Sequence, residues 1–332
     1  MPPLAVSLGD PAGVGPELIA EAWARREDKR LSPFFVVGGA ALLAEAAAAR
    51  GLAVPIRKIT SPDEAAAAFG SALPVIGELE GAYDPGLPDR AGAELALASL
   101  TEATRLAVSG KASGVVTGPI AKSRLAEVGF AFPGQTEFVA AACGVAPQDA
   151  VMMLAGPNLR TVPLTVHIAL AEVSSALTAA LIERRCRIVA MALQGDFGIV
   201  SPRLAVAALN PHASEDGRFG DEEARLIAPA IAALRAAGID ATGPHPADAL
   251  FAARARATYD VALCMYHDQA LIPLKALDFD NGVNITLGLP IIRTSPDHGT
   301  AFSIAGKGIA DAGATIAAIR MAGECASRRA AG

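Results

Sequence analysis

Side chains that could do chemistry gather in one late stretch of an otherwise alanine-rich, apolar chain. Between Met265 and Ala301 the sequence places two histidines, several carboxylates, a lysine, two asparagines and an arginine. Imidazoles bind metals or transfer protons, and a guanidinium is a fork suited to phosphate or carboxylate. The stretch therefore predicts a site that combines a cation, an anion and a proton-transfer group.

Three of the five histidines terminate segments that we predict to be strands: His167, His212 and His267. In open α/β sheets, ligands bind outside the carboxyl ends of the strands. Three neutral imidazoles leave positions open on Zn²⁺ or a similar divalent ion, as in a catalytic metal site. We predict such a site here, while a hydrogen-bonded structural role is the alternative for each histidine taken alone.

Two carboxylates are the nearest candidates to orient these histidines. Asp268 follows His267 directly. Asp248 lies in the segment before the predicted strand Val261–Met265. A carboxylate that accepts the second N–H of a metal-binding histidine fixes its tautomer. Helix capping or solvation is the alternative role for both residues.

Strand-like and helical segments alternate through the first part of the chain. This alternation predicts a parallel sheet covered by helices. We predict strands at Leu4–Ser7, Phe34–Val37 and Gly114–Thr117, and helices beginning near Leu18, at Ala40–Ala49 and at Ala91–Val108. The turn Gly9–Glu17 could present N–H groups to an anion, and Lys122 could reach one after the third strand. A plain tight turn and a solvated lysine are the alternatives.

The middle of the chain predicts a hairpin, several helices and one more buried strand. Thr136 is predicted to be the N-cap of a helix. The apolar run from Ala150 to Leu154 turns at Gly156–Asn158 and returns through Thr161–Val166. Further segments are predicted to be helical at Ser174–Leu193 and Asp221–Ala237, extended at Leu204–Leu209 and Val261–Met265, and a turn at Gly243–Asp248.

Composition excludes several classes of protein. Hydrophobic residues make up 52% of the 332 residues and charged residues 19%, which favours a well-buried fold over a disordered chain. The net charge of -6 argues against a nucleic-acid surface, which needs clustered basic residues. The four cysteines form no CxxC pair, and no signal peptide or membrane span is recognisable. We therefore expect a cytoplasmic protein without nucleic-acid or membrane partners.

Several blocks resemble the 4-hydroxythreonine-4-phosphate dehydrogenase family of pyridoxine biosynthesis, and the resemblance covers nearly the whole chain. The matching blocks are Gly9–Glu17, Thr117–Pro119, Leu209–His212, Pro246–Asp248, Met265–Gln269 and Asn284–Pro290. The resemblance implies NAD(P)-dependent oxidation of 4-phosphooxy-L-threonine to a β-keto acid, which loses CO₂ to give 3-amino-2-oxopropyl phosphate. It also implies a divalent metal (Zn²⁺, or Mg²⁺ or Co²⁺) and a homodimer whose subunits share each active site.

The same resemblance implies roles for individual residues. The metal ligands correspond to the three histidines already chosen, and Lys275, Asp248 and Asp268 are the candidates for acid-base chemistry. Substrate contacts correspond to Gln135, Thr136, Lys275, Asn284 and Arg293.

A second resemblance concerns the cofactor and the fold. The segment from His298 to Ala310 is similar to the adenine-binding loop of isopropylmalate and isocitrate dehydrogenases, which bind NAD without a G-x-G-x-x-G turn. It implies cofactor contacts from His298, Gly299 and Thr300. It also implies two α/β/α domains with a cleft between them: residues 1–128 plus 286–332 on the cofactor side, and residues 129–285 for metal, substrate and dimerisation.

One residue departs from the family pattern. Gln135 stands where the family usually has a histidine that contacts substrate, and an amide cannot carry charge. Dehydrogenation of another phosphorylated hydroxy acid, or of a dihydrodiol acid, is therefore an alternative within the family. A metal-dependent lyase or hydrolase, or a metal-stabilised binding protein, is an alternative from another class. The loop that begins at His298 favours a nucleotide-using enzyme over these.

Overall fold

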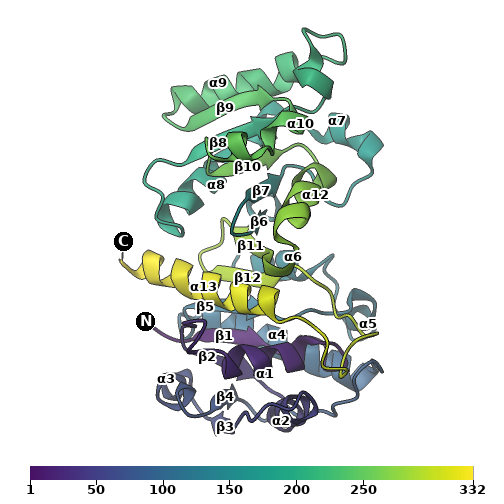
Figure 1. The fold of residues 1–332 in the computed structure, drawn as a ribbon, viewed down its shortest axis with the longest axis vertical. Coiled ribbons are helices and arrows are strands. Elements are labelled where there is room, and N and C mark those ends of the chain that lie inside the picture. The colour runs from purple at the N-terminus through teal and green to yellow at the C-terminus, as the bar shows by residue number, and fades with distance from the viewer. Residues whose placement is uncertain (332) are drawn as a thin grey trace. The chain divides into compact units, whose positions relative to one another are not determined.

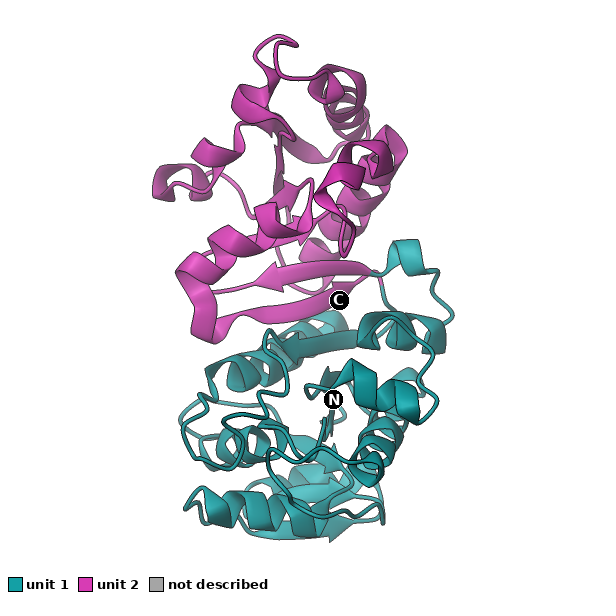
Figure 2. Ribbon diagram, turned by 90° about the vertical axis from the view of Figure 1, so that its right-hand side faces the viewer, with its two compact units in different colours: residues 1–150, 289–331 teal, residues 151–288, 332 magenta. Residues whose placement is uncertain are grey.

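The computed structural model describes residues 1–331, which form two compact units (Figure 2). Unit 1 contains residues 1–150 and 289–331, and unit 2 contains residues 151–288. The sequence had placed the two boundaries at 128/129 and 285/286. Residues 129–150 belong to unit 1 because Phe130 packs with Leu100 and Leu125, and because Val139 packs with Leu289.

Unit 1 is built on a parallel sheet with the strand order β3-β4-β2-β1-β5-β12 (Figure 1). Most of its strands are short and fully buried, as expected for a parallel sheet that is covered on both faces. The strands are β1 (Leu4–Ser7), β2 (Phe34–Val37), β3 (Ile56–Ile59), β4 (Leu73–Ile76), β5 (Gly114–Thr117) and β12 (Ile292–Pro296).

Helices α4 (Arg90–Val108) and α13 (Gly313–Ala331) cover opposite faces of this sheet. Val115 of β5 packs against α4, whereas Thr294, which pairs with Val116, hydrogen-bonds to the carbonyl of Ala318 in α13. Successive strand residues point to opposite faces, so the two helices are separated by the sheet. The other helices of unit 1 are α1 (Gly15–Ala24), α2 (Ala40–Ala49), α3 (Ala65–Phe69), α5 (Lys122–Glu127) and α6 (Gln135–Ala142), with short turns η1 (Pro62–Glu64) and η2 (Pro147–Asp149).

The sheet strands of unit 2 follow one another in the order β11-β6-β7-β10-β8-β9. Strand β6 runs antiparallel to both of its neighbours, because a tight hairpin joins it to β7, and the remaining pairs are parallel. The strands are β6 (Val151–Ala155), β7 (Arg160–Pro163), β8 (Arg203–Ala207), β9 (Asp240–His245), β10 (Val261–Cys264) and β11 (Val283–Leu287).

The core of unit 2 lies between this sheet and helix α12 (His267–Asp278), where Leu274 packs with Leu154 and Cys264. Helix α8 (Ala179–Gly195) contacts β6 and β11, and α9 (Ala228–Ala236) packs on β9 and α8. The remaining elements are η3 (Leu170–Glu172), α7 (Val173–Ala176), η4 (Pro211–Ser214), the π-helical turn η5 (Glu223–Ile227), α10 (Ala247–Leu250), α11 (Ala253–Arg256) and η6 (Phe279–Asn281).

Several local predictions need correction. Thr136 is not an N-cap, because α6 begins one residue earlier and Gly134 caps it. The turn predicted at Gly243–Asp248 is in part strand β9, which pairs with β8 through an irregular register. The single helix predicted over Ser174–Leu193 is two helices, with Thr178 capping the second. Strands β3 and β4 were not anticipated.

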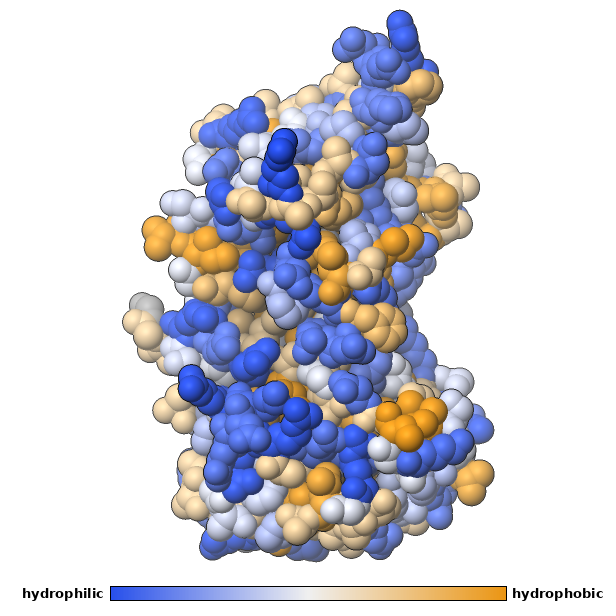
Figure 3. Space-filling model, in the orientation of Figure 1, coloured by the Kyte–Doolittle hydropathy of each residue, from blue (hydrophilic) through white to orange (hydrophobic). Residues whose placement is uncertain are grey.

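The surface carries no extended apolar face in the view of Figure 3, where hydrophobic side chains form small separate groups among polar ones. Within residues 1–331, no helix has the length and apolar character that crossing a membrane requires. None of the four cysteines, which all lie within residues 1–331, forms a disulfide.

Candidate functional site

In unit 1, two segments singled out in the sequence pack against each other. Strands β1, β5 and β12 are parallel neighbours, so their carboxyl ends meet at one edge of the sheet. The amide of Asp10 donates to the carbonyl of Pro119 at 2.8 Å, and the amide of Val14 donates to the carbonyl of Thr300 at 2.9 Å. The glycine turn and the segment that begins at His298 therefore form one continuous structure.

This close packing explains two of the glycines in the turn. Gly9 has φ +75°, and a Cβ there would lie 2.7 Å from the carbonyl oxygen of Pro119. A Cβ on Gly13 would lie 2.8 Å from the carbonyl oxygen of Thr300. Both distances are shorter than any ordinary contact, so only glycine lets the backbones approach in this way.

His298 offers an unused hydrogen-bonding atom in this region. Its Nδ1 lies 2.9 Å from the carbonyl oxygen of Gly299, which requires Nδ1 to carry the proton. Nε2 is then an acceptor, and it is buried without a hydrogen-bond partner within residues 1–331. A buried polar atom without a partner calls for an explanation, and a ligand that donates to it is one.

Arg293 of β12 is the most deeply buried cation of the predicted site, with 3% of its surface exposed. Its Nη2 donates to the hydroxyl of Thr117 at 2.8 Å and to Oε1 of Gln135 at 3.1 Å. Its Nη1 donates to the hydroxyl of Thr136 at 3.3 Å. Unit 1 thus brings together three of the predicted substrate residues, Gln135, Thr136 and Arg293.

The environment of Arg293 is unfavourable for a charge. Burial lowers the pKa of its guanidinium to about 10, while the nearby Glu137 acts in the opposite direction. The guanidinium remains protonated at neutral pH, and the three partners just named are neutral. An anion that reached it would gain a strong charge-assisted hydrogen bond.

In unit 2, the three histidines follow the carboxyl ends of three adjacent parallel strands, β7, β10 and β8. They do not end the strands as predicted. His267 is the first residue of α12, His167 lies four residues beyond β7, and His212 lies in η4. Parallel order still places all three at one edge of the sheet, as the sequence suggested.

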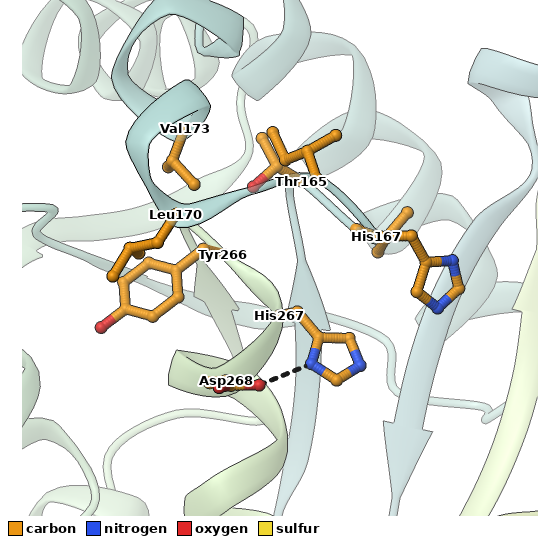
Figure 4. Close-up of a pocket in the computed structure, with 9 residues that line it drawn as sticks. Thr165, His167, Leu170, Val173, Tyr266, His267 and Asp268 are labelled. Carbon is orange, nitrogen blue, oxygen red and sulfur yellow. Dashed lines mark hydrogen bonds and ion pairs between the residues drawn. The ribbon is translucent and has the colours of Figure 1, made fainter.

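Two of these histidines lie side by side in a pocket of about 230 Å³ (Figure 4). The ring centroids of His167 and His267 are 5.8 Å apart. Nδ1 of His267 lies 2.7 Å from Oδ1 of Asp268, so the carboxylate holds the tautomer in which Nε2 is free to accept. The other side chains of the pocket are Thr165, Val166, Ile168, Leu170, Val173 and Tyr266.

His212 lies apart from this pair within one chain. Its ring packs on Phe219, with centroids 6.2 Å apart. No group of three or more His, Cys, Asp or Glu side chains among residues 1–331 is arranged to hold a metal ion. A single chain therefore brings two of the three predicted ligands together.

The backbone at these histidines is unusual. His167 has φ +49° and His212 has φ +52°, and the left-handed conformation continues from His212 through Asp216. Such a conformation costs of order 1 kcal/mol or more for a residue with a Cβ, and it clusters at functional sites. The strain is an independent sign that these positions serve more than packing.

The remaining predicted residues of unit 2 lie on separate elements. Lys275 lies two turns along α12 from His267, and its ammonium is 5.9 Å from the centre of the Phe279 ring. Asn284 lies in β11, and its Oδ1 is buried without a hydrogen-bond partner in the described chain. Asp248 is exposed on α10, which packs against the turn that carries His212.

Sequence reasoning missed residues that hold these groups in place. Thr117 ends the strand next to Arg293, and this neighbour relation could have been inferred from the strand order. Glu223 is 3% exposed and accepts hydrogen bonds from the amides of Leu209 and Asn210, just before His212. No local sequence pattern predicts that the carboxylate of Glu223 binds these amides.

Comparison with known proteins gives close relatives along the whole chain. A 4-hydroxythreonine-4-phosphate dehydrogenase of Erythrobacter litoralis is 66% identical over 328 residues, which cover 99% of this chain and 98% of the relative. The crystal structure of a 4-hydroxythreonine-4-phosphate dehydrogenase from Klebsiella pneumoniae is 38% identical with a TM-score of 0.86, covering 98% of this chain and 100% of that one.

A more distant structure is that of a terephthalate 1,2-cis-dihydrodiol dehydrogenase from Burkholderia xenovorans. It is 29% identical with a TM-score of 0.67, and the match covers 97% of each chain. The family described as "Pyridoxal phosphate biosynthetic protein PdxA" matches residues 30–322. With this match over most of its length, the chain belongs to the PdxA family.

Proposed function

We propose that this protein oxidises 4-phosphooxy-L-threonine with NAD or NADP to a β-keto acid, which decarboxylates to 3-amino-2-oxopropyl phosphate in pyridoxal phosphate biosynthesis. The family supports this reaction. The structural observation that carries it is the buried Arg293, which Thr117, Gln135 and Thr136 hold in place and which is charged at neutral pH. A small phosphorylated amino acid supplies the anion that such a fork recognises.

Candidate substrate residues occur in both units. In unit 1, Arg293 and Thr136 form the anion-binding group, and Gln135 holds Arg293. From unit 2, Lys275 supplies a positive charge or an acid-base group, and the unpartnered Oδ1 of Asn284 accepts a hydrogen bond from the substrate. Asp248 remains a candidate for acid-base chemistry.

The chemistry of the donor set fits a divalent metal, with Zn²⁺ as the first candidate. Asp268 fixes His267 with Nε2 as an acceptor, and His167 lies beside it. We propose that His212 of a second copy of the chain completes the set, so that a homodimer shares each site. A divalent ion held there would supply Lewis acidity toward the substrate oxygens.

The cofactor is assigned to unit 1. The glycine turn and the segment from His298 to Thr300 are joined by a backbone hydrogen bond, and Nε2 of His298 is a free acceptor. These features support contacts from His298, Gly299 and Thr300 to the adenosine part of a nicotinamide cofactor. Hydride acceptance is the chemistry that this cofactor supplies. We also infer that the enzyme works in the cytoplasm, where its cofactor and substrate are found.

A second candidate is dehydrogenation of a cis-dihydrodiol acid. The observation that favours it is the structural likeness to the dihydrodiol dehydrogenase, together with Gln135 in place of the usual histidine. A dihydrodiol acid offers a carboxylate, which Arg293 would also bind.

Steady-state measurement of nicotinamide reduction tests the two candidates side by side. The purified protein is supplied with Zn²⁺, Mg²⁺ or Co²⁺ and with NAD or NADP, and is given 4-phosphooxy-L-threonine, unphosphorylated 4-hydroxythreonine or a cis-dihydrodiol of terephthalate. We expect reduction and CO₂ release with the phosphorylated amino acid, and a large rise in KM for the Arg293→Lys variant. Turnover of the dihydrodiol alone would assign the second function, and no reduction under any condition would refute both.

A further inference from the structure

Gln135 is the first residue of α6, and both polar ends of its side chain form hydrogen bonds. Oε1 accepts from Nη2 of Arg293 at 3.1 Å, and Nε2 donates to the carbonyl of Gly118 at 2.9 Å. A guanidinium can only donate and a carbonyl can only accept, so the amide fits in one orientation. Gln135 therefore ties Arg293 to the end of β5.

Two hydroxyl groups hold the guanidinium of Arg293 together with Gln135. Thr117, at the end of β5, and Thr136, in the first turn of α6, hold the same guanidinium. The three partners fix Arg293 from two different elements. A group held in this way is oriented before an anion arrives, which lowers the entropic cost of binding.

We propose that Gln135 is a positioning residue that presents Arg293 to the anionic group of the substrate, and that it does so equally well in mildly acidic and in neutral solution. This inference rests on the proposed function for the identity of the anion. It differs from a direct substrate contact in that Oε1 and Nε2 of Gln135 act within the protein, on Arg293 and on Gly118.

Gln135 should act equally well across this pH range because its amide has a single protonation state, whereas an imidazole has two. A neutral imidazole at this position could accept from Arg293 at one nitrogen and donate to Gly118 at the other. A protonated imidazole donates at both nitrogens, so it would lose the bond from Arg293 and place a second cation beside it. The amide of Gln135 keeps one acceptor and one donor throughout this pH range.

Other charged groups face this position and must be the same in any comparison. They are Arg293 from β12, Lys122 from α5, whose ammonium lies beside Gly134, and Glu137 from α6 itself. A single substitution at Gln135 leaves all of them in place. The ratio of variant to wild-type kinetics at each pH also cancels the ionisation of the substrate phosphate.

The Gln135→His variant tests the proposal through the sign of a pH effect. We measure kcat and KM for 4-phosphooxy-L-threonine in both proteins between about pH 5.5 and 8.5, across the ordinary imidazole pKa of about 6.5. We expect the ratio of kcat/KM, variant to wild type, to fall about tenfold toward acid, mostly through KM, a change that corresponds to about 1.4 kcal/mol. A ratio that rises toward acid would mean that residue 135 touches the anion itself, and a flat ratio would also overturn the proposal.

In the Gln135→Glu variant we expect KM to change with pH in the opposite direction. A carboxylate accepts from Arg293 but cannot donate to Gly118, and its charge competes with the substrate anion, so KM should rise at neutral pH and recover toward acid as the carboxylate protonates. Thermal melting of each variant controls for folding. ³¹P NMR titration with inorganic phosphate gives the same comparison without turnover: the predicted signs in this assay support the positioning role even if 4-phosphooxy-L-threonine is not oxidised, and their absence refutes it.

Discussion

The amide of Val14 donates a 2.9 Å hydrogen bond to the carbonyl of Thr300, although the two residues lie at opposite ends of the sequence. The bond joins the turn after β1 to the segment after β12. The bond therefore holds the sequence motif near the N-terminus against the segment proposed to bind the cofactor. Residues that hold the glycine turn or the segment after β12 in place should therefore affect cofactor binding.

Arg50 holds both segments in place through hydrogen bonds. Its Nη2 donates to the carbonyl of Ala310, its Nε donates to Glu21 at 2.6 Å, and its Nη1 donates to Glu17 at 3.2 Å. We expect Arg50→Ala to raise the KM for the nicotinamide cofactor about tenfold, equivalent to about 1.4 kcal/mol, with little change in kcat. Fluorescence titration of the cofactor provides a second measurement.

The same substitution should lower stability, because Glu17 is 1% exposed and would lose its cation. Removing one partner of a buried pair costs roughly 3–5 kcal/mol. Adding Glu17→Gln should restore part of the stability but not the cofactor KM. Arg25→Ala is the matched control, since Arg25 pairs with Glu21 at the surface, and an equal rise in KM there would contradict the role given to Arg50.

Glu223 is expected to hold the segment that carries His212. Its carboxylate accepts from the amides of Leu209 and Asn210 at 2.9 and 2.7 Å, and from Nδ2 of Asn210 at 3.0 Å. In Glu223→Gln the new amide group would face that side-chain donor, at a cost of about 1–3 kcal/mol. We expect a lower melting temperature and a reduced metal content by elemental analysis.

The exposed Asp221→Asn, which alters a surface pair with Arg225, is the control for Glu223. Unchanged metal content in Glu223→Gln, together with normal folding, would show that the position of His212 does not depend on this carboxylate.

The sequence predicted the parallel strands and the edge of the sheet at which the candidate residues lie, because buried strands are short apolar runs and the polar residues that follow them share an edge. It did not predict strand β3, where Arg57 and Lys58 interrupt the apolar pattern. It also did not predict the contact of Arg50 with Ala310, 260 residues away, since such contacts depend on tertiary packing alone. Thr136 was assigned to a cap, yet its hydroxyl accepts from Arg293.

The buried carboxylate of Asp10, in the glycine turn, is expected to lower the free energy of unfolding at neutral pH. It is 2% exposed; Oδ1 accepts from the amide of Ala12, and Oδ2 has no hydrogen-bond partner in the described chain. Burial, and to a smaller extent Asp89, raises the pKa of this carboxyl. The folded state then binds the proton more tightly than the unfolded state, so stability is lost as the pH rises above the unfolded value near 4.

Asp10→Asn removes this charge and keeps the acceptor for Ala12. We expect the variant to be more stable than the wild type at pH 7, by about 1 kcal/mol, and the gain to shrink toward pH 4. Denaturant unfolding at both pH values measures this difference. Asp89→Asn, which leaves Asp10 ionisable, should give a smaller gain. A stability difference that does not depend on pH would contradict this account.

The last prediction concerns how the metal ligands divide between subunits. His167 and His267 lie 5.8 Å apart within one chain, whereas His212 packs on Phe219, so we assign His212 to the site of the other subunit. Each histidine-to-alanine variant alone should lose metal and activity. A heterodimer of His212→Ala and His267→Ala chains would contain one site with all three ligands.

Mixing and reannealing these two variants should therefore restore part of the activity and about one metal ion per restored site, as read by elemental analysis. The pair His167→Ala and His267→Ala should restore nothing, because both substitutions affect the same chain's contribution to a site. This pair is the matched control for the mixing procedure. Equal recovery in both mixtures, or in neither, would mean that the histidines are not divided in this way, since the mixtures differ only in whether the chain paired with His267→Ala carries His212→Ala or His167→Ala.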